Sequence, residues 1–153
     1  MYVTSLGLSH RTQTGKFICK RCGETVAQAE DLVSIPSKLA LQRWNKTILG
    51  KPHITTQKFE NPQGAQFEVV TFSEASVTSN EDAHTEATWF PGYSWRISAC
   101  SRCNFFLGWK YQPVNFNHMT FTENDKFYGL IMDHIIQDID SDSLVIIQHP
   151  NAR

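Results

Sequence analysis

Three segments of the 153-residue chain alternate between apolar and polar residues or are rich in β-formers. Residues 93–99 place Tyr, Trp, Ile and Ala on one face and Ser, Arg and Ser on the other, and residues 107–111 alternate in the same way. Residues 66–72 are rich in Val, Phe and Thr and follow a tight turn predicted at Asn-Pro-Gln-Gly, 61–64. Because successive side chains of a strand point to opposite faces, all three segments are predicted to be strands.

The remaining pattern is less regular. Residues 127–136 and 144–147 are predicted to be two further strands, separated by an acidic turn at 138–142. Residues 29–33 fit a short helix stopped by Pro36, and residues 39–44 fit another helical turn or two. Residues 73–88 are polar and are predicted to form a loop. The pattern as a whole predicts a mainly antiparallel β architecture.

Composition and charge narrow the class of protein. Hydrophobic residues make up 41% of the chain and charged residues 19%, as in ordinary globular domains. Fourteen Lys and Arg against fifteen Asp and Glu leave a net charge of -1, so we expect no nucleic-acid partner. We also expect no membrane span, because no apolar run reaches about 18 residues.

These features predict one domain and a monomer. We expect a poorly ordered or disordered segment at residues 1–15 and the folded domain at 16–150. Residues 1–16 lack the apolar stretch of a signal peptide. The expected location is therefore the cytoplasm or nucleus, or outside the cell if a signal peptide has been removed from this chain.

All four cysteines fall into two Cys-x-x-Cys pairs, Cys19/Cys22 and Cys100/Cys103. The two-residue gap lets both thiolates of a pair bind one metal ion, and two pairs complete a tetrahedral zinc site. The alternatives are two disulfides, which are strained between cysteines three apart, or four free thiols. We predict one structural Zn²⁺, because four thiolates leave no open position for an activated water.

Three of the four tryptophans, Trp89, Trp95 and Trp109, lie within twenty-one residues. A hairpin would bring Trp95 and Trp109 together near Tyr111, and the Phe-Pro-Gly at 90–92 would fold Trp89 back toward them. Such a cage suits a cation held over π faces or a flat neutral ring. Large aromatic residues in a β domain are usually core residues, so spacing alone favours that alternative, and it does not choose between the two kinds of ligand.

Several motifs taken together resemble a known family. They are Trp-Phe-Pro-Gly-Tyr-Ser-Trp at 89–95, Leu-Gly-Trp-Lys-Tyr at 107–111, both cysteine pairs, the turn at 61–64 and Phe-Tyr-Gly-Leu at 127–130. The chain resembles the thalidomide-binding, or CULT, domain family of cereblon from about residue 17 onward, and we expect a stand-alone, single-domain member. The resemblance implies a β-tent fold, in which two antiparallel sheets meet at an angle and are pinned by a zinc ion held by four cysteines.

The family binds cyclic imides in a cage of three tryptophans. The implied ligands are glutarimide- or thalidomide-type, uridine-like or dihydrouracil-like rings, or a cyclised C-terminal residue of a protein. Trp89, Trp95 and Trp109 would form the walls and Tyr111 the base, while the imide edge meets the backbone. The residues implied to contact the ligand are Asn61, Pro62, Ala87, Thr88, Trp89, Trp95, Trp109 and Tyr111. The family in vertebrates has a histidine at the position of Ala87, so a side-chain hydrogen bond to the imide is missing here.

The same motifs bear on two other functions. Methionine sulfoxide reductase B also carries zinc in two such pairs but needs a further cysteine, and we find no other catalytic motif, so we predict no enzyme. The alternative function is the substrate-recognition module of a cereblon-type cullin-RING ubiquitin ligase receptor, present here as a fragment. Contact with the ligase adaptor is not expected from this chain alone, because the Lon-like domain and helical segment it requires do not fit before residue 17.

Overall fold

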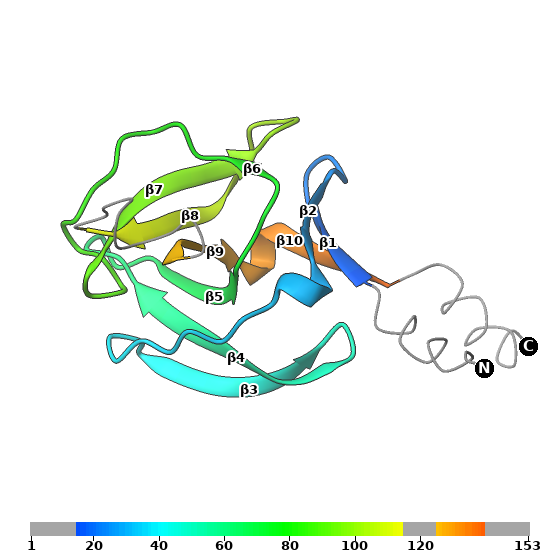
Figure 1. The fold of residues 1–153 in the computed structure, drawn as a ribbon, viewed down its shortest axis with the longest axis horizontal. Helices are drawn as coiled ribbons and strands as arrows, with labels where there is room; N and C mark the ends of the chain where they lie inside the picture. Colours follow the sequence, from blue (N-terminus) through cyan, green and yellow to red (C-terminus); the bar gives the residue numbers. More distant parts are fainter. Residues whose placement is uncertain (1–14, 115–124, 140–153) are drawn as a thin grey trace, which may run out of the picture.

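The computed structural model describes residues 15–114 and 125–139 (Figure 1). These residues form ten strands and two short 3-10 helices, η2 (Ala29–Asp31) and η4 (Met132–His134). The strands are β1 (Gly15–Cys19), β2 (Thr25–Gln28), β3 (Gln42–Ile48), β4 (Lys51–Glu60), β5 (Gln66–Phe72), β6 (Val77–Thr78), β7 (Tyr93–Cys100), β8 (Phe106–Pro113), β9 (Phe127–Ile131) and β10 (Ile135–Ile139). No helix in this part of the chain has the length and apolar character needed to cross a membrane.

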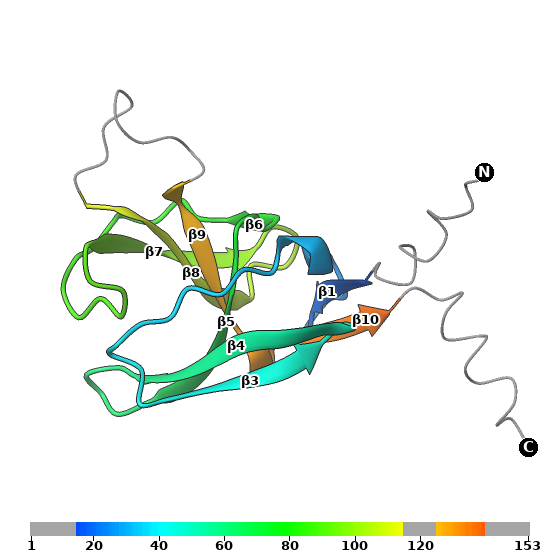
Figure 2. The same cartoon turned by 60° about the horizontal axis from the view of Figure 1, so that its bottom comes forward.

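The strands form two antiparallel sheets. The larger has seven strands in the order β3-β4-β5-β9-β8-β7-β6, and the smaller has the order β10-β1-β2. In Figure 2, β3 and β4 lie below β7 and β8, with β5 and β9 running between the two pairs. The sheets are joined by η4, which links β9 of the larger sheet to β10 of the smaller. The prediction of a mainly β fold with two antiparallel sheets is confirmed.

The elements with the clearest sequence patterns are confirmed. Strand β5 has the predicted bounds, and β7 and β8 cover the two alternating segments. The turn at 61–64 is closed by the Gly64 N–H, which donates to the Asn61 carbonyl at 2.9 Å. The Asn61 side chain also accepts from the backbone N–H of Ala65 at 2.8 Å. Because an Asn side chain that bonds the backbone of its own turn stabilises that turn, the four residues 61–64 were enough to predict it.

Several sequence predictions were wrong. Residues 39–44 are not helical: β3 begins at Gln42, because Trp44, Lys46 and Ile48 turn inward while the residues between them are exposed. The helix expected at 29–33 is reduced to the single turn of η2, after which Leu32 forms a β-bridge with Phe72.

Two further elements differ from the prediction. The strand expected over 127–136 is broken by η4 into β9 and β10, and the loop at 73–88 contains the short strand β6. The acidic turn begins inside β10, which ends at residue 139. The strand expected at 144–147, the rest of that turn and residues 1–14 lie outside the described residues.

Buried side chains form two clusters. The first lies around Phe17 and Phe72, whose ring centroids are 5.1 Å apart, and includes Cys19 and Cys100. The second is largely aromatic and includes Phe59, Phe90, Trp109, Tyr111 and Phe127. The second cluster packs beneath the cavity that is described in the next section, and Trp109 and Tyr111 belong to both.

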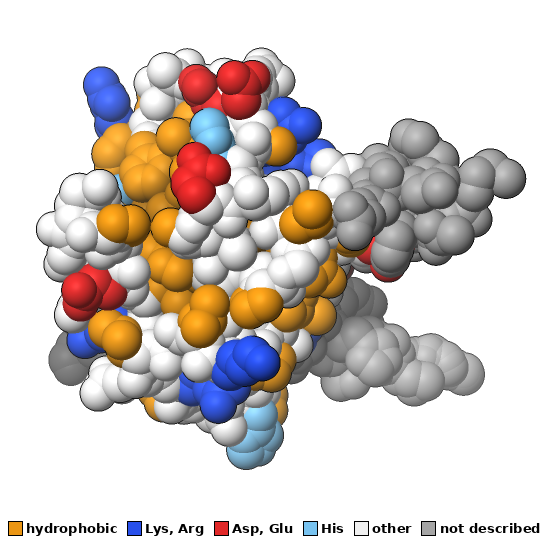
Figure 3. All heavy atoms as spheres, turned by 90° about the vertical axis from the view of Figure 1, so that its left-hand side faces the viewer, with side chains coloured by type: hydrophobic (Ala, Val, Ile, Leu, Met, Phe, Trp, Pro, Cys, Tyr) orange, Lys and Arg blue, Asp and Glu red, His pale blue; other side chains and the backbone are white. Residues whose placement is uncertain are grey.

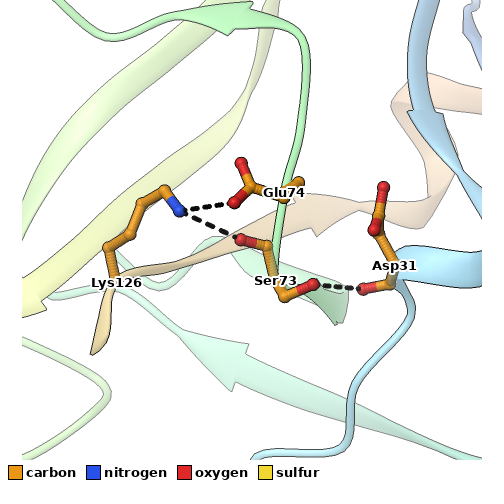
Figure 4. A network of polar contacts seen from close by, with 4 residues as sticks. All are labelled: Asp31, Ser73, Glu74 and Lys126. Atoms are coloured by element: carbon orange, nitrogen blue, oxygen red, sulfur yellow. Dashed lines mark hydrogen bonds and ion pairs between the residues drawn. The ribbon is translucent and has the colours of Figure 1, made fainter. Parts of the chain in front are cut away.

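A polar network holds the end of β5 in place (Figure 4). Lys126, only 9% exposed, donates to the Glu74 carboxylate at 2.9 Å and to the Ser73 carbonyl at 3.3 Å. The Ser73 N–H donates to the Asp31 carbonyl at 2.8 Å. Partial burial raises the pKa of the Asp31 carboxyl group, and the nearby Glu30 and Glu74 carboxylates add to the effect. The network ties η2 and the residue before β9 to one segment.

Candidate functional site

The two cysteine pairs occupy matching turns. Cys19 ends β1 and Cys100 ends β7, and in each turn the residue four positions later donates its N–H to the cysteine carbonyl at 2.8 Å. That residue is Gly23 in the first turn and Asn104 in the second, with φ of 83° and 66°. Both residue types tolerate this left-handed conformation, which turns the chain back so that the second cysteine joins the first.

The four thiols lie together, as the spacing predicted. The Sγ atoms of Cys19 and Cys103 are 3.7 Å apart, those of Cys22 and Cys100 are 3.6 Å apart, and all four lie within 4.8 Å of one another. Four sulfurs at about 2.3 Å from a tetrahedral ion are about 3.8 Å apart, which agrees with these distances. A disulfide would need about 2.05 Å. The four cysteines can therefore hold one metal ion.

Electrostatics also favour a cation at this centre. Burial raises the pKa of Cys100, but backbone N–H groups of Cys103 and Arg102 outweigh it and lower the pKa to about 7. At Cys22, hydrogen bonding from the Glu24 backbone lowers the pKa, but burial and the three other thiols raise it to about 12. Four thiols this close cannot all lose their protons without a positive charge between them.

A cavity of about 390 Å³ opens beside the aromatic cluster. Figure 3 shows the face that lies on the left in Figure 1, where hydrophobic side chains form a band with acidic and histidine side chains beside it. The residues lining the cavity are Asn61, Pro62, Gln63, Phe67, Glu86, Ala87, Trp89, Trp95, Ile97, Phe106, Trp109 and Tyr111. A mainly apolar cavity of this size, with a few polar groups, is typical of a small-molecule site.

The three predicted tryptophans converge on this cavity. Trp95 on β7 lies opposite Tyr111 on β8, and Trp109 lies two residues before Tyr111 on the same strand. Trp89 precedes β7, and its ring lies edge-to-face with Trp109, with centroids 4.8 Å apart at 78°. We call Trp89, Trp95 and Trp109 the tryptophan cage. The hairpin register thus produces the convergence that sequence spacing suggested.

Two cage rings are fixed by their indole N–H groups. Trp89 donates to the Glu60 carbonyl at 3.1 Å, and Trp95 donates to the Glu86 carbonyl at 2.9 Å. Phe59, fully buried, stacks on Trp89 with centroids 4.8 Å apart at 10°. Since both N–H groups are bonded to backbone, these rings offer the cavity apolar surface rather than donors.

Most of the predicted ligand residues line the cavity. Asn61, Pro62, Ala87, the three cage tryptophans and Tyr111 do so, whereas Thr88 does not. The Thr88 hydroxyl instead contacts the backbone of Phe90, 3.4 Å from its nitrogen. Ala87 has φ of 55°, an uncommon conformation for a residue other than glycine.

Sequence reasoning missed the supports of the cage. Ser37, 4% exposed, donates its hydroxyl to the Trp89 carbonyl at 2.5 Å and accepts from the Leu39 N–H at 3.1 Å. The Ser37 N–H donates to the buried Gln57 side chain at 2.7 Å. No local pattern marks these long-range bonds. Phe67 and Ile97 could have been found from the sequence, because Phe67 alternates with Val69 and Ile97 shares a face with Trp95 on the predicted strands, but Phe106 lies before the alternating segment and gave no sign of lining the cavity.

Fold and site together define a class of protein. It is a β domain in which one hairpin, β7–β8, carries two of the four clustered cysteines that could hold a metal ion and two of the tryptophans that line an aromatic cavity. No family model matches the chain. The chain is similar to Protein cereblon of Gallus gallus, Drosophila melanogaster and Drosophila grimshawi, with 33%, 30% and 29% identity over 86, 105 and 105 residues. These likenesses cover 53%, 66% and 69% of this chain.

The similarity relates this chain to cereblon and confirms the resemblance carried by the cysteine and tryptophan motifs. The chain matches only 14–18% of the length of these curated relatives. The Mis18 'Yippee-like' domain aligns with 82% of this chain and 95% of its own, at 16% identity and a TM-score of 0.46. That likeness is too remote to say anything about function.

Proposed function

We propose that the cavity binds cyclic imides without catalysing a reaction, and that the four cysteines hold one structural Zn²⁺. One observation carries the ligand proposal. Among the described residues, neither the Trp89 N–H nor the Ala87 carbonyl has a hydrogen-bond partner, and both residues line a cavity with aromatic walls. A donor and an acceptor two residues apart are thus free beside apolar surface.

A cyclic imide is chemically complementary to this arrangement. It is flat and neutral, and one edge presents acceptor, donor and acceptor in a row. One carbonyl can accept from the Trp89 N–H while the imide N–H donates to the Ala87 carbonyl, and the methylenes then lie against the cage. The Trp89 carbonyl is already bonded to Ser37, which holds the segment in place. A lactam or open-chain amide would leave one of these groups unpaired, at a cost of about 1–3 kcal/mol.

The expected affinity is modest. Glutarimide has about eight non-hydrogen atoms, which suits a dissociation constant near micromolar on ligand-efficiency grounds. Ala87 supplies no side-chain hydrogen bond, which weakens binding by about 0.5–1.5 kcal/mol relative to a residue that does.

The test is a titration of zinc-loaded protein with glutarimide, followed by tryptophan fluorescence, with the ring-opened diamide as control ligand. We expect a saturable change with the imide alone. Trp95→Ala should abolish the response and Trp44→Ala should spare it, because Trp44 lies on β3 and does not line the cavity. A wild-type protein that ignores glutarimide, or an equal loss in both variants, would contradict the proposal.

A zinc ion suits the four thiolates better than the harder divalent cations, which prefer oxygen ligands. Cys19, Cys22, Cys100 and Cys103 would hold it and would fill its tetrahedral shell. When bound, it would supply folding energy and no Lewis-acid chemistry at an open position.

A second candidate function rests on the matched length. Because the chain corresponds to 14–18% of its cereblon relatives, it could serve as the substrate-recognition module of a cereblon-type ubiquitin ligase receptor. Sequencing the transcript upstream of the Met1 codon distinguishes the two functions. A reading frame that continues into a further domain supports the receptor module, and an in-frame stop codon supports a stand-alone imide-binding domain.

A further inference from the structure

One charged side chain stands among the residues that line the cavity. Of the described lining residues, Glu86 alone carries a charge, and its side chain is 73% exposed, which places the carboxylate at the cavity mouth. The pKa of this carboxyl group is lowered, chiefly by a hydrogen bond from its own backbone N–H and also by His84, so it is ionised at neutral pH. A carboxylate beside aromatic rings favours a bound cation over a neutral ring.

The neighbouring His84 engages this carboxylate. Its Nδ1 atom lies 3.3 Å from Glu86 Oε2. An ionised carboxylate can only accept a hydrogen bond, so Nδ1 carries the proton that lies between the two groups. His84 is not among the residues that line the cavity. The Glu86 carboxylate therefore has a partner outside the cavity.

His84 also packs against Trp95, one wall of the tryptophan cage. The backbone N–H of each residue donates to the carbonyl of the other, at 2.9 and 2.8 Å, in an isolated β-bridge. The imidazole and indole ring centroids are 4.7 Å apart at 37°. Because His84 does not line the cavity, it contacts the indole from outside. The bridge is made by backbone atoms, so it remains when the side chain at position 84 is changed.

We propose that His84 is a positioning residue that makes the cavity select neutral rings over quaternary ammonium cations. This inference rests on the proposed function. A cation in the tryptophan cage would gain from the π faces and from a free carboxylate at the mouth. With His84 in place, that carboxylate is engaged, and positive charge on the imidazole lies against the Trp95 ring and opposes a cation on its other side. A neutral imide held by the backbone of Ala87 and Trp89 needs neither group.

The expected size of the effect follows from an exposed charge pair. The His84 and Glu86 side chains are 40% and 73% exposed, and a pair of this kind changes affinity by roughly 2- to 5-fold. His84→Ala should therefore tighten the binding of tetramethylammonium by about this factor and leave glutarimide binding unchanged or weaker. A purely structural role for His84 would instead weaken the binding of both ligands together.

The experiment measures dissociation constants of tetramethylammonium and glutarimide, at constant ionic strength, for zinc-loaded wild type, His84→Ala, Glu86→Gln and the double variant. The gain in cation affinity caused by His84→Ala should vanish when Glu86→Gln is also present, because no carboxylate is then released. His84→Arg should keep the wild-type selectivity, since arginine both pairs with carboxylates and stacks on aromatic rings.

The matched control is Glu81→Gln. It removes an exposed carboxylate from the same segment, but Glu81 does not line the cavity, so both dissociation constants should stay unchanged. Zinc content and melting temperature, measured on every variant, identify any that fail to fold.

The outcomes separate this inference from the proposed function. If wild type does not bind glutarimide, the proposed function fails. If wild type binds glutarimide but His84→Ala does not shift the ratio of the two constants toward tetramethylammonium, the role of His84 is overturned while the proposed function stands. A shift that persists in the double variant, or that Glu81→Gln reproduces, overturns it equally.

Discussion

Removal of a single hydroxyl outside the cavity should impair both stability and ligand binding. The change is Ser37→Ala. It deletes the donor that the Trp89 carbonyl receives at 2.5 Å and the acceptor that the Leu39 N–H reaches at 3.1 Å. Alanine fits the site, because the substitution only removes an oxygen atom. The Trp89 carbonyl and the Leu39 N–H nevertheless lose their hydrogen-bond partner, in a region where Ser37 itself is buried.

The magnitude follows from those two groups. An unsatisfied buried donor or acceptor costs about 1–3 kcal/mol, and partial access to the cavity favours the lower half of that range. A loss of about 1–2 kcal/mol lowers the melting temperature of a domain of this size by roughly 3–8 °C. Because the freed carbonyl belongs to Trp89, glutarimide affinity should fall as well, by several-fold.

The assay is thermal unfolding with and without zinc, together with the glutarimide titration. Ser34→Ala is the matched control: its hydroxyl lies in the same segment and accepts from the Thr55 N–H at 3.2 Å, but that bond is exposed to water. We expect Ser34→Ala to stay within about 0.5 kcal/mol of wild type. If Ser37→Ala is as stable as Ser34→Ala and binds glutarimide equally well, then Ser37 does not position Trp89 and the reasoning is refuted.

Three other outcomes are expected. Stripping the metal with a strong chelator should unfold the domain, because thiolate coordination supplies folding energy, and an unchanged melting curve after verified metal loss would contradict this. Zinc affinity should rise at least about tenfold from pH 6 to pH 7, because Cys22, with a pKa of about 12, must release its proton when zinc binds. The affinity is measured by competition with a chromogenic chelator, and an affinity that does not change with pH would contradict thiolate coordination by Cys22. Gly108→Ala should lower the free energy of unfolding by about 3 kcal/mol or more, because the added Cβ would lie 2.1 Å from the Gly129 carbonyl oxygen. Gly92→Ala should cost only about 1 kcal/mol, because Gly92 also has a positive φ but has open space around it. Equal effects of the two substitutions in urea denaturation would overturn this explanation.

The strands that the sequence revealed are those rich in large apolar residues. In β7 and β8 these residues alternate with Ser, Arg, Gly and Lys, as the pleat of a strand requires, although burial does not follow the alternation: Ser98 is fully buried, whereas Ile97 is 39% exposed. The β3–β4 hairpin escaped because its inward positions are filled by residues such as Lys46, Thr56 and Gln57, which no hydrophobicity pattern distinguishes from a solvent-exposed segment. Pairing with a neighbour, rather than local preference, makes that hairpin a sheet.

The site was predictable to a different degree in its two parts. Metal-ligand spacing is local, so two cysteine pairs sufficed to predict the cluster of thiols, although the bound ion stays a prediction. The position of Trp95 beside Trp109 and Tyr111 depends on the pairing register of strands β7 and β8, and the alternation of apolar and polar residues in both segments pointed to that hairpin. Ser37 and Gln57 lie about 50 and 30 positions before Trp89, and in the sequence nothing distinguishes them from the polar residues of an exposed segment. Imide recognition by these residues also remains a prediction.

The β7–β8 hairpin connects the cysteine cluster physically to the aromatic cavity. Its tip supplies Cys100 and Cys103, and its body supplies the paired residues Trp95 and Tyr111, so a loss of order at the tip is transmitted along the ladder to the cavity. On the proposed function, zinc binding and imide binding would then be coupled, and thermodynamic reciprocity would require each to strengthen the other by the same factor. A higher zinc affinity in the presence of saturating glutarimide, measured by competition with a chelator, would reveal this coupling, and an unchanged affinity would exclude it. With such coupling, a shortage of zinc would silence ligand recognition well before the chain itself became scarce.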